Sequence, residues 1–323
     1  MSEIVAVEPA PSPVPVGAPE PLSAEDREAL RRAVGSLERP SLAGRLSAMA
    51  GAPLDLITRA LPAPVVDAVG HATETAMRGA LHVALATLPK AAETTEPGSE
   101  AQALAPLGPD LAPSWRTRAL ELLGRFPPGD RGHKALAAVS GAIGGAFGIT
   151  TLAVELPVST TLMLRSIAEI AQREGEDMAD PEAALACMQV FALGGRGATQ
   201  GEGAAGNPAE SGYFAVRGAL AKAMSEAARY AAGRGLVDES APALMRFAGQ
   251  VGARFGGVVS QKLAAQAVPV LGALGGAAVN TAFMDHFQSI ARGHFTVRRL
   301  ERRYGKALVR EAYEAERAAL GTA

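Results

Sequence analysis

The sequence predicts an all-α fold, a single helical domain with two glycine-rich apolar helices packed at its centre. Apolar residues make up 48% of the 323-residue chain but aromatic residues only 4%, so alanine, valine, leucine and their like supply the excess. Alanine and leucine favour helices, whereas the β-branched and aromatic pattern of sheets is weak. Two uncharged runs, residues 135–154 and 263–284, support the same conclusion, because each is as long as a bilayer-crossing helix and stops at a carboxylate.

The first third of the chain is predicted to contain a disordered lead followed by helices. Residues 1–22 are acidic and proline-rich, and they hold too little apolar surface to fold. Ser23 is a suitable N-cap, and the acidic residues after it suit the first turn of a helix. Residues 23–126 are therefore expected to form an N-terminal helical region, with a mobile linker near residues 89–113, where Pro, Gly, Thr and Ser accumulate.

Residues 130–310 are predicted to form the helical core, and residues 311–323 the end of a C-terminal helix. The first apolar helix is expected to break at the Glu155-Leu156-Pro157 junction, since proline disfavours a helical residue before it and suits the first helical position. Asp180 and Pro181 mark a later helix start in the same way. Further helices are expected over residues 213–232 and 242–255, then in the second apolar run, then in a basic segment reaching about residue 320.

The composition excludes several classes of function. The formal net charge is −2, which gives no argument for binding nucleic acid or another polyanion. The single cysteine, Cys187, excludes an internal disulfide and a cysteine-based metal cage, and its apolar neighbours predict a buried thiol. The N-terminus has neither the basic nor the apolar region of a secretory signal, so a cytoplasmic location is expected. No cofactor or metal is indicated.

The two glycine-rich runs are interpreted as helix-packing surfaces. Residues 141–146 (GAIGGA) and 272–277 (GALGGA) each place small residues at a spacing that lets another backbone approach closely. Neither run follows a predicted strand or shows the GxGxxG spacing, and the phosphate-binding pattern GxxxxGK[ST] is absent from the chain. The glycine faces of the two runs are therefore expected to pack on each other.

Glu155 and Asp285 are the candidate catalytic residues, because each follows or ends an apolar run in which an unpaired carboxylate is costly. Such a carboxylate needs a basic partner, backbone N–H donors at a helix N-terminus, or a raised pKa. A structural helix-junction cap and a functional acid both remain open for Glu155. His286 and His294 lack metal-binding spacing, and His294 lies on an apolar stripe, which predicts a core histidine.

A basic stripe near the C-terminus is the candidate binding surface. On one continuous helix its members fall within roughly 40° of a line opposite the apolar stripe, because they are seven, four, three and four residues apart. A solvated helix face and a strip that binds an anionic lipid surface or an acidic partner are both open interpretations. The members are Arg292, Arg299, Arg303, Lys306 and Arg310.

A series of motifs covers a little over half of the chain, from about residue 135 to residue 305. They are SGAIGGAFG (140–148), ELP (155–157), LMLRSIAEIAQREG (162–175), VFALGG (190–195), GYFAVRGAL (212–220), VPVLGALGGAAVN (268–280) and HFTVRRLERRYG (294–305). In this order the motifs resemble those of the EcsC family of bacterial proteins, which is named after a gene beside an ABC-transporter operon. The resemblance implies a helical protein and supplies no catalytic residues. Where the family usually has Asp before Leu-Pro, this chain has Glu155.

Three functions follow as hypotheses. The leading one is a non-enzymatic cytoplasmic protein that associates peripherally with the inner membrane or a membrane transporter, with an anionic membrane surface as the partner. The second is an enzyme, of hydrolase-like type, that uses Glu155 and Asp285 as buried acids. The third is a purely soluble interaction module whose apolar runs are ordinary core.

Overall fold

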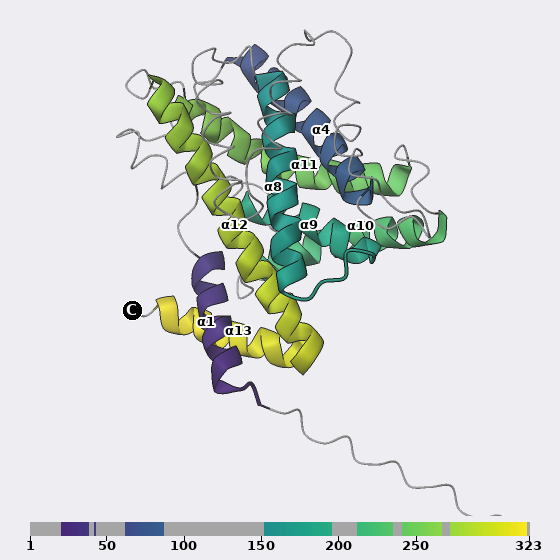
Figure 1. Ribbon diagram of the computed structural model, residues 1–323, viewed down its shortest axis with the longest axis vertical. Helices are drawn as coiled ribbons and strands as arrows, with labels where there is room; N and C mark the ends of the chain where they lie inside the picture. The colour runs from purple at the N-terminus through teal and green to yellow at the C-terminus, as the bar shows by residue number, and fades with distance from the viewer. Residues whose placement is uncertain are drawn as a thin grey trace, which may run out of the picture.

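The computed structural model places eight helices and no strand in the part of the chain that it describes, so the predicted all-α, single-domain fold is confirmed (Figure 1). None of these helices combines the length and the hydropathy that crossing a membrane requires. The described residues are 21–38, 42, 62–86, 152–195, 212–234, 241–266 and 272–321.

Helix α1 (Ala24–Leu37) begins where the sequence predicts it. The side chain of Ser23 accepts a hydrogen bond from the backbone N–H of Asp26 at 3.1 Å, which is the N-cap interaction. The apolar face of α1 packs along the second half of α12 (Gly272–Tyr304). This packing is close because Gly293 has no side chain; a Cβ atom there would lie 2.8 Å from Cγ of Leu37.

Helices α4 (Ala63–Ala86) and α8 (Leu152–Arg173) pack against each other, and α8 also packs against α12 (Figure 1). The predicted break at Glu155–Pro157 is wrong, since α8 runs through Pro157 without interruption. An interior proline costs about 3 kcal/mol. Full burial of Leu156 and Ile167 on the same helix offsets this cost, because each buried leucine or isoleucine stabilises the fold by about 1.5–3 kcal/mol.

Helix α9 (Pro181–Gly194) occupies the centre of the described core, in contact with α4, α8, α10, α11 and α12. It starts as predicted, with the side chain of Asp180 accepting from the backbone N–H of Glu182 at 2.9 Å and proline in the first turn. Every residue from Ala183 to Gly194 is buried. A helix that is apolar on all sides is stable only when other elements surround it completely.

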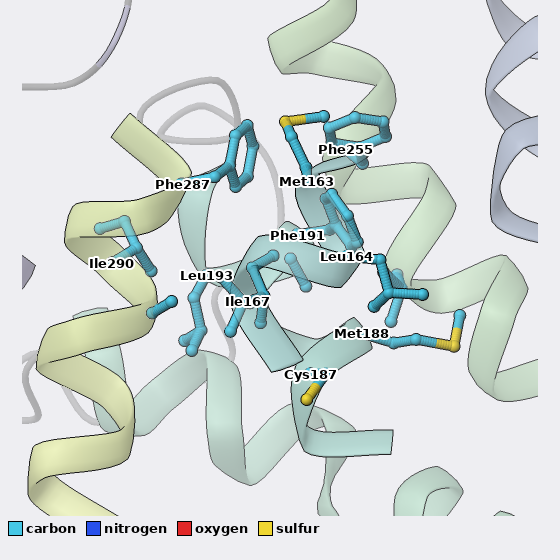
Figure 2. Packing of buried hydrophobic residues seen from close by; sticks show 14 of the residues in the cluster. Met163, Leu164, Ile167, Cys187, Met188, Phe191, Leu193, Phe255, Phe287 and Ile290 are labelled. Atoms are coloured by element: carbon cyan, nitrogen blue, oxygen red, sulfur yellow. The ribbon is translucent and has the colours of Figure 1, made fainter. Parts of the chain in front are cut away.

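An aromatic cluster joins α9 to its neighbours (Figure 2). Phe191 of α9 lies 5.0 Å from Phe255 and 5.5 Å from Phe287 between ring centroids. Cys187, on the same helix, is 2% exposed, which confirms the predicted buried thiol. Burial, together with the nearby charge of Glu176, raises the pKa of this thiol to about 12, so it stays protonated and unreactive at neutral pH.

The remaining helices are α10 (Gly212–Arg234), α11 (Pro242–Gln266) and α13 (Lys306–Gly321). The second apolar run does not form the one separate helix that the sequence predicted. Its first residues end α11, and its glycine-rich part begins α12, which continues through the basic segment to Tyr304. Gly305 then adopts a φ of +88°, the left-handed conformation that ends a helix, and α13 departs in a new direction (Figure 1).

Several predictions concern parts of the chain outside the described residues. Residues 1–20, the linker near 89–113 and the first apolar run up to residue 151 belong to these parts, and so do the side chains of residues 272–276. The packing of the two glycine-rich runs on each other and the domain boundaries therefore stay predictions.

Replacement of Gly194 by alanine is expected to lower stability by about 1–3 kcal/mol, because the new Cβ would lie 2.3 Å from the buried ring of Phe287. The control is Gly218→Ala on α10, where a Cβ meets nothing within 4 Å and helix propensity adds up to about 1 kcal/mol. Urea denaturation of both variants measures the difference. Equal stability of the two variants would contradict the close contact.

Candidate functional site

The arginines in the last turns of α12 bind the polar segment that follows α8. In this segment Gly175 has a φ of +78° and lies between two glutamates. Arg298 donates to both carboxylate oxygens of Glu176, from Nε to Oε1 at 2.9 Å and from Nη2 to Oε2 at 3.1 Å. Arg302 also donates to Glu176 and, from Nη2, to the backbone oxygen of Glu174 at 2.7 Å. Two arginines thus share one carboxylate whose side chain is 5% exposed.

The electrostatics of Glu176 follow from this geometry. Burial tends to raise the pKa of this carboxyl, but the hydrogen bonds and charges of Arg298 and Arg302 outweigh burial and hold the pKa below its usual value. Glu176 is therefore ionised at neutral pH and serves as the anchor of α12 on the end of α8.

A second cluster, the Asp26 clasp, consists of Asp26, Arg299, Arg303 and Tyr304 and fixes α1 to α12. Nη1 of Arg299 and Nη1 of Arg303 each donate to Asp26 at 3.0 Å, and the hydroxyl of Tyr304 donates to it at 2.8 Å. The hydrogen bond from Tyr304, and then that from Arg299, lowers the pKa of Asp26 against the opposing effect of burial. Nε of Arg299 also donates to Glu174 at 2.9 Å, which ties the clasp to the end of α8.

These contacts change the interpretation of the basic stripe. Arg299 and Arg303 belong to the Asp26 clasp, so they are structural as well as cationic. Because α12 ends at Tyr304, the single line that the sequence suggested does not exist: Lys306 and Arg310 lie on α13. Together with Arg292 on α12, these two residues are exposed.

A third cluster lies inside the protein, where the start of α10 meets α12. Arg217 forms a two-bond pair with Glu301, with both N···O distances 2.8 Å, and its Nη1 donates to the hydroxyl of Tyr213 at 3.3 Å. The Tyr213 hydroxyl lies 2.9 Å from Nδ1 of His294. The ring of Tyr213 stacks on that of Tyr313 from α13 at 5.4 Å. One buried polar chain therefore connects α10 with α12, and the stacked tyrosine rings add α13.

His294 is fully buried, which confirms the predicted core histidine. Burial, and then the positive charges of Arg217 and Arg298, lower the pKa of His294 well below its usual value, so the ring is neutral at physiological pH. Since Arg217 donates to Tyr213, the tyrosine proton is free to point at Nδ1, and this assignment puts the histidine proton on Nε2. In the part of the chain that the structure describes, Nε2 has no hydrogen-bond partner.

Of the two candidate acids, Glu155 and Asp285, the structure describes the side chain of Asp285 alone. Glu155 lies within α8, but its side chain is outside the described residues. Asp285 is half-buried on α12. His286, next to it, is buried and bonds the backbone oxygen of Gly194 at 3.0 Å, so it caps the end of α9. Across the described ranges, no three His, Cys, Asp or Glu side chains are grouped so as to hold a metal ion.

An open groove between α4 and α11 was not predicted from the sequence. Its volume is about 420 Å³, and small or apolar residues of both helices form most of its lining. The sequence contained a partial signal, the series Gly249, Gly252 and Gly256 on one helix, which resembles ordinary close-packing glycines.

Removal of one partner of the Arg217–Glu301 pair is expected to be costly. Glu301→Leu leaves the charge of Arg217 largely buried without its carboxylate, and we expect stability to fall by about 3 kcal/mol. The double variant Arg217→Met/Glu301→Leu replaces both charges by apolar groups and is expected to recover most of the loss. Urea denaturation tests both variants. Equal losses would show that packing, rather than the unpaired charge, determines the cost.

Asp26→Asn is expected to lower stability at neutral pH by about 1–2 kcal/mol, because two charge-assisted hydrogen bonds lose their charge.

The pKa values of Asp26 and Glu176 are lowered in the folded protein, so their stabilising effect is complete above about pH 4 and is lost as pH falls through the folded pKa. The wild type should therefore lose more stability than Asp26→Asn between pH 6 and about pH 3. Thermal unfolding across this pH range measures the difference, and the exposed variant Glu28→Gln is the control. If the stability of the wild type and that of Asp26→Asn fell in parallel with pH, the clasp would be refuted.

Comparison with known proteins gives the family of the chain. A sequence profile described as the EcsC protein family matches residues 25–300. The match extends beyond the motifs noted in the sequence and includes α1, so it contains both Asp26 and Arg299 of the clasp. No curated protein and no solved structure matches the chain. Because the profile covers well over half of the chain, the protein belongs to the EcsC protein family.

Proposed function

We propose that this protein is a non-enzymatic helical protein that associates peripherally, on the cytoplasmic side, with the anionic surface of the inner membrane or with a transporter embedded in it. The observation that carries the proposal is the exposure of Arg292, Lys306 and Arg310. All three residues are cationic and exposed in a protein whose overall charge is −2.

The expected attraction is weak and reversible. Each Lys or Arg close to an anionic bilayer contributes about 1 kcal/mol, and salt screens the contribution within about 10 Å at 0.1 M. The two such residues of α13, Lys306 and Arg310, therefore supply about 2 kcal/mol, which suits a protein that exchanges between membrane and solution.

The state of the buried acids favours a binding role over catalysis. Asp26, Glu176 and Glu301 have side chains that are at most 7% exposed, and arginine binds each of them. The lowered pKa values of Asp26 and Glu176 make these two carboxyl groups poor proton donors and acceptors near neutral pH. These groups therefore suit a rigid scaffold.

The test is sedimentation with phosphatidylglycerol vesicles, with phosphatidylcholine vesicles as the neutral reference, at low and high salt. The wild type should bind only the anionic vesicles and should be released by salt. Lys306→Glu/Arg310→Glu should bind about thirtyfold more weakly, since two contributions of about 1 kcal/mol are lost. Arg299 and Arg303 are left unchanged because their replacement would also open the Asp26 clasp.

A matched control is Lys222→Glu/Arg229→Glu, which makes the same change of charge on the exposed face of α10. We expect this variant to bind like the wild type. Equal weakening of both double variants would mean that net charge alone, rather than the surface of α13, determines binding. Absence of wild-type binding at low salt would reject the proposal and favour a soluble interaction module.

A further inference from the structure

We draw no further inference here: the strongest candidate, the half-open groove of small and apolar residues between α4 and α11, carries none, because nothing in the described part of the structure shows what covers it.

Discussion

Pairing between the arginines of α12 and carboxylates of other segments is the interaction on which the arrangement of this protein depends. Arg298 and Arg302 hold the end of α8 through Glu176, and Arg299 joins α1 to the same place. Glu301, on the same helix, holds α10 through Arg217. Three elements, namely α1, the end of α8 and α10, therefore meet around one segment of α12 a few turns long. Removal of one partner leaves a buried charge, which is more costly than the pair itself is stabilising.

The apolar core and this polar region contribute differently to the fold. The core around α9 is uniform on all sides of the helix, and its hydrophobic burial favours compaction without fixing a direction (Figure 2). The ion pairs and the chain from Arg217 through Tyr213 to His294 require defined distances and angles. We infer that burial supplies most of the stability, whereas the polar contacts select one way of placing α1 and α10 around the core.

The sequence predicted features that depend on neighbouring residues. The caps at Ser23 and Asp180 and the buried position of His294 follow from local spacing, and the structure confirms them. Partners distant in sequence were not predictable, because periodicity shows which face of a helix is buried but not which helix covers it. The contact between Asp26 and Arg299, 273 residues apart, is the clearest case. Gly305 was a missed local signal, since glycine after arginines in a last turn is typical of a helix end.

The Asp26 clasp also has a consequence for the order of events during synthesis. Asp26 and Tyr304 are separated by 278 positions, so a ribosome that adds about 5–20 residues per second needs roughly 14–56 s to produce the second after the first. During this interval α1 exists without the helix that covers its apolar face. Asp26 thus acquires its final contacts only after Tyr304 has been synthesised, and the nascent protein must keep an amphipathic helix soluble until then.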